Sequence, residues 1–251
     1  MMRKMKRWMV RHLLRDWPTR RVNDMVRLTL GNPARTYSGP FKGMRYVDRS
    51  IGSTYYPKIL GTYELELTPV WEELFSGNHD IFIDVGAAEG YFAVGVALRT
   101  SWPVIAFEAD PRTPLPELAA LNEVEDRIRL YPACDLRSLA EAIDDHSHPL
   151  LLVDIEGSEL LLLDPHYIPS LRRATLIVEI HDCFLPGTGQ RLIERFQPTH
   201  AIERVDTRVR TPSDFPLPLP SLPFDPSQYT LSYMDEQRQA DTYWLILRPI
   251  P

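Results

Sequence analysis

The sequence lacks any run of about eighteen consecutive apolar residues, the length that crosses a bilayer as a helix. It has only two cysteines, Cys134 and Cys183, so it carries neither a cysteine-based metal cluster nor a disulfide framework. We therefore expect no transmembrane segment, two free thiols and a reducing, cytoplasmic location. With 44% hydrophobic and 25% charged residues, the 251-residue chain has the composition of one globular domain with additions.

Acidic residues are scarce at the start of the chain, although the net charge is −6. The first thirty residues hold nine Lys or Arg side chains against Asp16 and Asp24. Apolar side chains recur there at helical spacing, at Met5, Trp8, Met9 and Leu13. This pattern predicts an amphipathic helix that packs on the domain or on a second subunit as a homodimer contact. Contact with a membrane surface or an acidic partner stays open, as does an organellar presequence, whereas the acidic remainder of the chain disfavours nucleic acid.

The stretch from Asp84 to Gly90 follows the β-forming run Ile81-Phe82-Ile83 and precedes a helix-like segment over 91–99. This order predicts a strand, a glycine turn and a helix, with a small ligand bound where the backbone turns. Because Glu89 and Asp84 would repel a pyrophosphate, the ligand is expected to carry an amine. S-adenosylmethionine, which presents an ammonium, a carboxylate and a sulfonium, is favoured over a dinucleotide.

A second strand over 104–108 ends in Glu108, eighteen residues after Gly90. An acidic side chain at this distance is placed to accept hydrogen bonds from both ribose hydroxyls of an adenosine-type ligand. NAD enzymes share this feature, so the spacing of the glycines decides between the cofactors. The pattern Asp-x-Gly-x-x-x-Gly here differs from the Gly-x-Gly-x-x-Gly of dinucleotide sites.

From residue 80 onward, apolar runs typical of strands alternate with helical patterns, which predicts a parallel sheet. The expected strands are 80–85, 104–108, 127–133, 150–155 and 174–180, and the expected helices are 90–99, 113–121, 136–143, a segment from Ser158, and 189–196. Residues 201–209 and 243–247 are expected to pair as an antiparallel hairpin at one edge. Between them the stretch 211–226 contains six prolines, which predicts an ordered loop over the site, or otherwise a disordered link.

Four motifs occur in order: Phe-Ile-Asp-Val-Gly-Ala-Ala-Glu-Gly-Tyr, Ala-Phe-Glu-Ala-Asp-Pro, Val-Asp-Ile-Glu-Gly-Ser-Glu and Ile-Val-Glu-Ile-His-Asp. Over residues 80–185 the chain resembles FkbM-type class I methyltransferases, and the turn 154–159 is the most specific match. The resemblance implies a Rossmann-like α/β fold whose mostly parallel seven-stranded sheet has the order 3-2-1-4-5-7-6, with helices on both faces. We expect a basic helical and extended cap over 1–78 and a methyltransferase domain over 79–251, with 211–241 as an insertion.

The same resemblance implies S-adenosylmethionine as the cofactor and a hydroxyl of a sugar, polyketide or other small metabolite as the methyl acceptor. Matched positions give Glu108 as the ribose acid and Asp154 as the strand end beside the methyl group, and Asp135 could reach the adenine amine. The predicted donor-binding residues are Asp84, Gly86, Ala87, Glu89, Gly90, Tyr91, Glu108, Ala109, Cys134, Asp135 and Asp154.

The predicted catalytic residues are His181, Asp154 and Glu156. His181 is the first candidate for the base, because an imidazole titrates near neutral pH and this one ends the fifth strand. A divalent-metal site of Asp154, Glu156, Glu179 and Asp182 is an alternative that is not favoured, because strand alternation directs Asp182 away from Glu179 and His181. Tyr63 and Glu64 either fold over the donor or belong to the cap, and Glu159 begins a helix.

Three other functions remain open. The acceptor atom is a nitrogen of a small molecule or of a macromolecule, or the chain is a non-catalytic module that binds S-adenosylmethionine, or it is a dehydrogenase. The basic N-terminus is the only feature of the sequence that favours a macromolecular acceptor.

Overall fold

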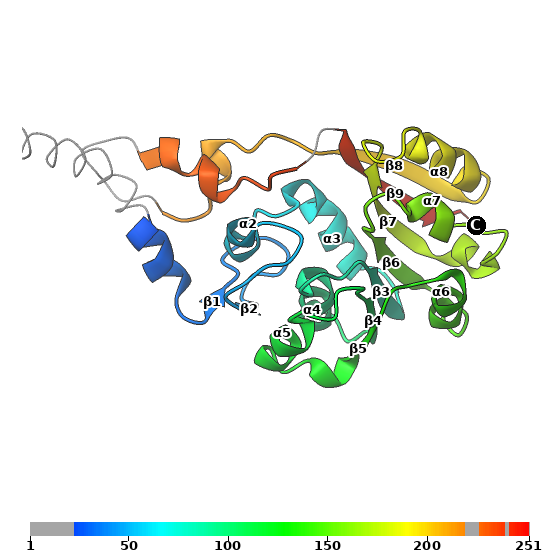
Figure 1. Ribbon diagram of the computed structural model, residues 1–251, viewed down its shortest axis with the longest axis horizontal. Helices are drawn as coiled ribbons and strands as arrows, with labels where there is room; N and C mark the ends of the chain where they lie inside the picture. The colour runs from blue at the N-terminus through cyan, green and yellow to red at the C-terminus, as the bar shows by residue number, and fades with distance from the viewer. Residues whose placement is uncertain (1–22, 219–225, 239–240, 251) are drawn as a thin grey trace, which may run out of the picture.

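The computed structural model describes residues 23–218, 226–238 and 241–250. Within these ranges, no helix is both long and apolar enough to cross a membrane. The central feature is a seven-stranded sheet with the order β5-β4-β3-β6-β7-β9-β8 (Figure 1). Its strands are β3 (Ile81–Val85), β4 (Val104–Phe107), β5 (Ile128–Tyr131), β6 (Pro149–Val153), β7 (Thr175–His181), β8 (His200–Asp206) and β9 (Thr242–Pro249). The order confirms the predicted 3-2-1-4-5-7-6.

The first five strands of the sheet are parallel, and β9 runs antiparallel to both β7 and β8. The central strands β3 and β6 are buried at every position, as expected for continuous apolar runs that helices cover on both faces. Their register pairs Val85 with Val153, so the two strands end side by side. The polar residues that follow these strands are therefore brought to one edge of the sheet.

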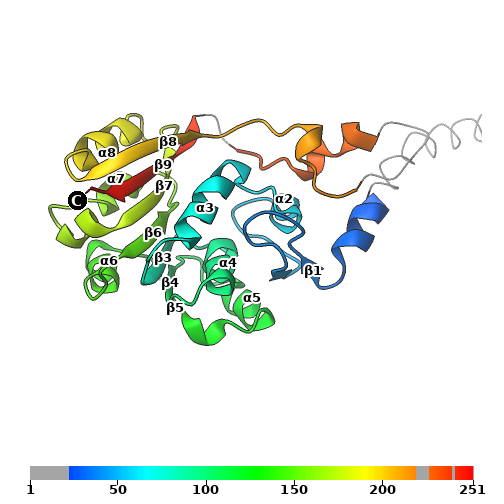
Figure 2. The ribbon, with the colours of Figure 1, turned by 180° about the vertical axis from the view of Figure 1, so that it is seen from behind.

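Alternate residues of the central strands enter two different cores. Phe82 and Leu152 pack on one face with α4 (Tyr91–Arg99) and α5 (Leu115–Leu121). Ile83 and Val153 pack on the other face with side chains of α6 (Leu136–Ile143) and α8 (Thr188–Phe196). The ribbon in Figure 2 shows α6 on the opposite side of the strands from α4 and α5. The period of two along a strand thus divides each apolar run between the two layers of helices. The helix expected from Ser158 is a single turn, α7 (Glu159–Leu162).

The segment before the sheet packs into the α4 side of the same core. It contains a helix over 23–30, β1 (Ala34–Arg35), β2 (Arg45–Tyr46), α2 (Tyr55–Leu60), a 3₁₀ turn (Leu65–Leu67) and α3 (Thr68–Phe75). Trp71 is buried and stacks on Phe92 of α4. β2 pairs antiparallel with β1. The predicted basic helix around Met5 to Leu13 lies outside the described residues.

The excursion between β8 and β9 runs along this N-terminal segment toward its far end (Figure 1). Its described part holds three 3₁₀ turns, Pro212–Asp214, Pro226–Tyr229 and Leu231–Tyr233. Tyr233 is buried with its ring edge-on to Tyr56, at a centroid distance of 5.0 Å. The excursion therefore packs on the N-terminal segment, and its last described residues return to the edge of the sheet where the polar residues gather.

Candidate functional site

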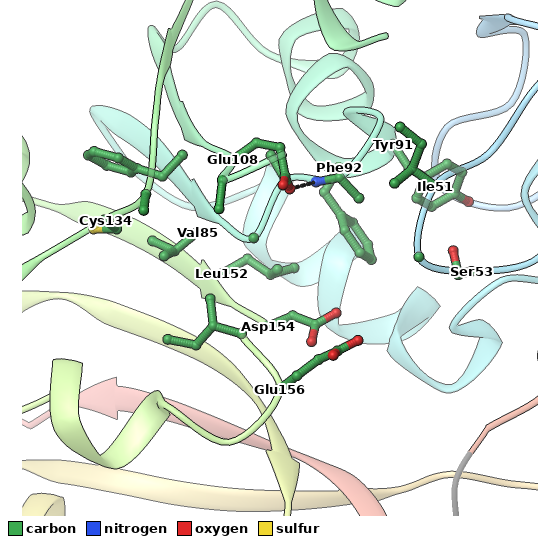
Figure 3. A pocket seen from close by; sticks show the side chains of 18 of the residues that line it. Ile51, Ser53, Val85, Tyr91, Phe92, Glu108, Cys134, Leu152, Asp154 and Glu156 are labelled. Atoms are coloured by element: carbon green, nitrogen blue, oxygen red, sulfur yellow. Dashed lines mark hydrogen bonds between the residues drawn. The ribbon is translucent and has the colours of Figure 1, made fainter. Parts of the chain in front are cut away.

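A cavity of about 480 Å³ opens at the carboxyl ends of β3, β4 and β6 (Figure 3). This volume lies in the range of about 300–1,000 Å³ that is typical of small-molecule sites. The turn after β3, the end of β4 and the segment after β6 form the sheet side of the wall. Residues 51–53, Lys58 and Tyr63 close it from the N-terminal segment. The cavity therefore lies where open α/β sheets bind ligands.

The turn between β3 and α4 fits tightly between its neighbours. Gly86 has φ +89°, and a Cβ on it would lie 1.9 Å from the carbonyl oxygen of Asp154. The amides of Gly86 and Ala87 both donate to the carbonyl of Phe107, each at 3.0 Å. These contacts hold the ends of β3, β4 and β6 together, and they require glycine at position 86.

Glu108 is held in a fixed orientation at the end of β4. Its carboxylate accepts hydrogen bonds from the amides of Ala88 and Asp110, both at 2.7 Å. Each carboxylate oxygen has a second lone pair, so Glu108 can still accept from a bound ligand. The side chain lines the cavity, as the sequence position predicts.

Most of the predicted donor-binding residues meet at the cavity. Its lining includes Gly86, Ala87, Tyr91, Glu108, Ala109, Cys134 and Asp154, and also the predicted catalytic residue Glu156. Four other predicted residues lie behind or beside the lining: Asp84, Glu89, Gly90 and Asp135. Asp135 caps α6, where its carboxylate accepts from the amide of Ser138 at 2.7 Å.

Asp84 is completely buried beneath the turn. Neither of its carboxylate oxygens makes a hydrogen bond of ordinary geometry within the described residues. Burial raises its pKa to about 8, although the amide of Ala93 and the charge of Lys58 act in the opposite direction. The side chain is therefore protonated over much of the physiological pH range.

Glu89 is also buried, and it points toward the N-terminal segment. It forms an ion pair with Lys58 and accepts hydrogen bonds from Tyr46 at 2.7 Å, Ser50 at 2.5 Å and the amide of Ile51 at 3.2 Å. Burial raises the pKa of Glu89, but the charge of Lys58 and these hydrogen bonds outweigh it, and the pKa is lowered. The pair joins the N-terminal segment to the turn after β3. Sequence reasoning missed Lys58, because it lies 31 positions before its partner.

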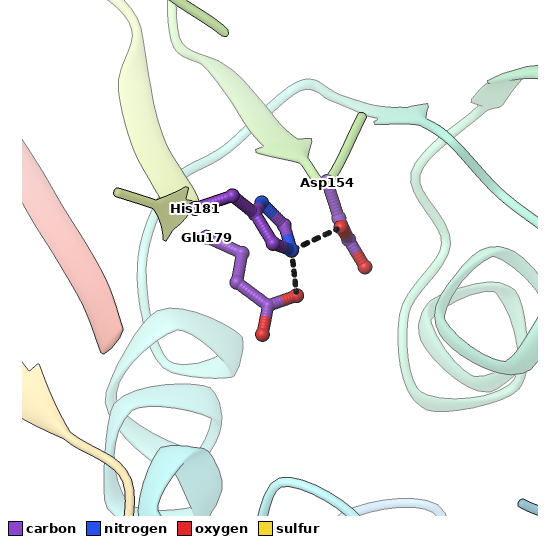
Figure 4. A group of neighbouring side chains, drawn as sticks. All are labelled: Asp154, Glu179 and His181. Atoms are coloured by element: carbon purple, nitrogen blue, oxygen red, sulfur yellow. Dashed lines mark ion pairs between the residues drawn. The ribbon is translucent and has the colours of Figure 1, made fainter. Parts of the chain in front are cut away.

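A second group of polar side chains lies beside the cavity, at the ends of β6 and β7. Nε2 of His181 lies 3.7 Å from Oδ1 of Asp154 and 3.7 Å from Oε2 of Glu179 (Figure 4). Nδ1 of His181 lies 3.0 Å from Oε1 of Glu159. The predicted catalytic pair of Asp154 and His181 is thus brought together. Glu159, which was expected only to begin a helix, is completely buried and holds the imidazole.

The charges of this group shift one another's protonation. Burial alone lowers the pKa of His181, but the hydrogen bond with Glu159 and the charge of Asp154 raise it above its usual value. Burial raises the pKa of Glu159, yet the hydrogen bonds from His181 and from the amide of Gly157 outweigh it and lower the pKa. Burial raises the pKa values of Asp154 and Glu179. Glu159 is therefore an anion that accepts the proton on Nδ1 of the imidazole.

Asp182 points away from this group, as strand alternation predicts. Its carboxylate accepts from the amide of Gly189 and the hydroxyl of Tyr243, each at 3.2 Å. Glu156 has a positive φ of 50° in the turn after β6, and its side chain faces the cavity (Figure 3).

Arg238, at the end of the excursion, reaches the same edge of the sheet. Its Nη1 lies 3.3 Å from Oε1 of Glu179, and its guanidinium pairs with Glu64. Glu64 also accepts from the indole of Trp244 at 2.7 Å. Burial raises the pKa of Glu64 to about 7 against the charge of Arg238. The sequence leaves two alternatives for Tyr63 and Glu64, folding over the donor or belonging to the cap. In the structure, Tyr63 lines the cavity and Glu64 lies in a buried ion pair.

A smaller recess of about 130 Å³ adjoins the main cavity. Asp154, Glu156 and Tyr63 line both spaces, and Glu179, His181 and Arg238 line the recess. A molecule in the recess would touch one in the cavity at Asp154, so the two spaces suit two reactants that meet.

Solved structures resemble this chain. A protein from Klebsiella pneumoniae assigned as an O-methyltransferase matches with a TM-score of 0.50 and 13% identity, over 76% of this chain and 82% of that one. The chain has the class I methyltransferase fold. An S-adenosylmethionine-dependent O-methyltransferase from Thermotoga maritima matches with a TM-score of 0.47 and 14% identity, over 75% of this chain and 66% of that one. The human methyltransferase 10 domain containing protein matches with a TM-score of 0.46 and 15% identity, over 80% and 86% of the two chains. No protein-family model and no curated protein sequence matches the chain.

In this chain, the cavity and the adjoining recess both lie at the carboxyl ends of the parallel strands. The larger one contains the glycine turn and the acidic strand end, and the smaller one contains the histidine. The arrangement can hold one ligand through Glu108 and the turn, and place a second beside Asp154.

Proposed function

We propose that this protein is an S-adenosylmethionine-dependent methyltransferase of the FkbM type that methylates a hydroxyl of a small molecule. The observation that carries the proposal is the cavity at the ends of β3, β4 and β6, with Glu108 fixed in its wall. The methyl donor occupies this cavity, and the acceptor occupies the adjoining recess.

The donor is oriented by groups at both ends of the cavity. Glu108 accepts hydrogen bonds from the ribose hydroxyls, while Ala109 and Cys134 flank the adenine. The methionine part extends past Gly86 and Tyr91 toward Asp154. Asp84, Glu89 and Gly90 support the turn from behind, and Asp135 fixes the start of α6 beside the adenine.

Methyl transfer then occurs at the junction of the two spaces. An acceptor hydroxyl in the recess lies in line with the sulfonium carbon, the new O–C bond forms as the S–C bond breaks, and S-adenosylhomocysteine leaves. Positioning supplies most of the rate, and removal of the hydroxyl proton supplies the rest. His181, Asp154 and Glu156 are the groups within the recess that take this proton.

An amine acceptor is the second candidate. Glu64, Glu156 and Glu179 line the recess together with Asp154, and Arg238 is the cation that opposes them. Such a surface attracts an ammonium, which must lose a proton before its nitrogen attacks the methyl group. The same groups would accept that proton.

We also propose that residues 1–78 act as a cap that completes the donor cavity of a methyltransferase domain over 79–251. Lys58 and Tyr63 support this division, because they close the cavity from the cap side. Residues 211–241 form an insertion in that domain, whose described end brings Arg238 to the recess.

Titration calorimetry of the full chain with S-adenosylhomocysteine and with adenosine tests the donor site. We expect micromolar binding of S-adenosylhomocysteine, weakened by about tenfold or more in Glu108→Ala, because hydrogen bonds to a charged acceptor are lost. Asp110→Ala is the matched control, since that carboxylate pairs with Arg112 at the surface. If the folded protein binds neither compound, the proposed function is wrong.

A further inference from the structure

Three side chains of different chemistry converge where β6 and β7 end. Asp154 follows β6, and Glu179 and His181 lie two positions apart on β7, so strand alternation places both on the same face. Each offers one ligand atom, and the three atoms lie within 4.8 Å of one another. Glu179 and His181 are buried, and Asp154 is half-buried. Figure 4 shows the three side chains pointing toward one another.

The imidazole is oriented by a group outside this trio. Glu159 is buried and accepts from Nδ1 of His181, which leaves Nε2 directed at the two carboxylates. The distance from Nε2 to each carboxylate is 3.7 Å, which is too long for a hydrogen bond. An imidazolium that paired directly with these carboxylates would close to about 2.7–2.9 Å. Nε2 therefore faces two carboxylate groups across a gap that no hydrogen bond closes.

We propose that Asp154, Glu179 and His181 bind a divalent first-row transition-metal ion, Zn²⁺ or Mn²⁺, in this gap. Ligand atoms that are each about 2.1 Å from one ion, at angles of 90–120°, lie roughly 3.0–3.6 Å apart. The two separations of 3.7 Å are close to this range. One imidazole nitrogen with two carboxylate oxygens suits Zn²⁺ and Mn²⁺ better than Mg²⁺ or Ca²⁺, which prefer oxygen ligands alone.

The surroundings of the three ligands support such a site. Glu159 fixes the ring of His181 in the way that second-sphere carboxylates orient metal-bound histidines. Arg238 contacts Oε1 of Glu179, whereas Oε2 faces His181, so one oxygen remains for an ion. Three protein ligands leave coordination positions for other molecules, and the adjoining recess gives access to them.

The chemical role of the ion rests on the proposed function, although its binding does not. An acceptor hydroxyl that binds the ion has a lowered pKa, so it loses its proton near neutral pH. With the ion bound, His181 and Asp154 would be ligands, so of the three groups proposed above to take the hydroxyl proton only Glu156, which lines both spaces, would remain free to do so.

The test is titration calorimetry of the chelator-treated full chain with Zn²⁺, Mn²⁺ and Mg²⁺ as chlorides. We expect one ion of Zn²⁺ or Mn²⁺ to bind per chain, with Mg²⁺ weaker by at least about tenfold. His181→Ala and Glu179→Gln should each weaken binding by at least about tenfold. Co²⁺ added in place of Zn²⁺ should give visible absorption bands, which the same variants lose.

Asp182→Asn is the matched control, because this carboxylate follows His181 directly and faces Gly189 and Tyr243. It should bind the ion as the unaltered protein does, and circular dichroism should show that all variants are folded. Unaltered ion affinity in both His181→Ala and Glu179→Gln, or no binding of Zn²⁺, Mn²⁺ or Co²⁺ by the unaltered chain, would overturn the site. Neither substituted residue lines the donor cavity, so S-adenosylhomocysteine binding in the same samples reports on the proposed function separately.

Discussion

At the scale of single residues, the buried ion pair of Lys58 and Glu89 joins the N-terminal segment to the turn between β3 and α4. The two side chains are 3% and 0% exposed. Taking both charges out of water is costly, and the remaining lone pairs of Glu89 are satisfied by Tyr46 and Ser50. The attraction between the two charges therefore adds little to the free energy of unfolding, whereas removing one partner leaves the other charge buried without compensation and lowers it strongly.

Glu89→Ala should lower the free energy of unfolding by about 3–5 kcal/mol, because it leaves the ammonium of Lys58 buried without its partner. Urea denaturation of the single variants and of the double variant Lys58→Met/Glu89→Ala measures this. The double variant should recover part of the loss, since no buried charge remains. Equal losses in Glu89→Ala and in the double variant would show that the uncompensated charge is not the cause. Arg49→Ala, which breaks an exposed pair with Glu117, should cost less than about 1 kcal/mol.

At the scale of elements, the turn between β3 and α4 is predictable from local sequence, whereas the contacts that support it are not. Apolar runs before and glycines within 84–90 predict a strand, a turn and a helix, and β3 and α4 lie there. That Gly86 must accommodate the backbone of Asp154 depends on β6 lying beside β3, a contact across 68 positions that no local pattern encodes.

Gly86→Ala should both destabilise the protein and weaken binding of S-adenosylhomocysteine by about tenfold or more, because the new methyl group would push the end of β6 away from the turn. Gly43→Ala is the matched control: its φ is +94°, but no atom lies within 4 Å of the new Cβ. It should cost about 1–2 kcal/mol of stability for the left-handed conformation and leave binding unchanged. Thermal unfolding and calorimetry measure the two effects, and the idea fails if both variants bind equally well.

At the scale of the whole molecule, periodicity predicts the sheet and the resemblance predicts its order, because each strand is an apolar run of its own and parallel strands need helical crossovers. The polar contacts around the site could not be predicted in this way. The carboxylate of Glu159 contacts His181 because the turn before it has positive φ at Glu156 and Gly157. Arg238 belongs to the excursion between β8 and β9, and the prolines of that segment predict only that it has no regular secondary structure. Both contacts are set by tertiary packing, so spacing along the chain does not reveal them.

The stability of the whole molecule should depend on pH through Asp84. Burial raises its pKa from 3.8 to about 8, so between these values the folded chain holds a proton that the unfolded chain has lost. Stability from this group is therefore fully present below about pH 4 and falls as pH rises, by up to about 1.4 kcal/mol per pH unit, until the folded carboxyl also ionises near pH 8.

Asp84→Asn removes this titration while keeping the shape of the side chain. Urea unfolding at about pH 5, 6, 7 and 8 should show that the variant gains stability relative to the unaltered protein as pH rises. Asp84→Ala should give the same pH dependence of the difference, displaced downward by a constant cavity cost. The lowered pKa of Glu89 acts in the opposite sense, but its contribution is lost only as pH falls below about 4.5, outside this interval. A difference between Asp84→Asn and the unaltered protein that stays constant from pH 5 to 8 would mean that Asp84 is already ionised in the folded chain.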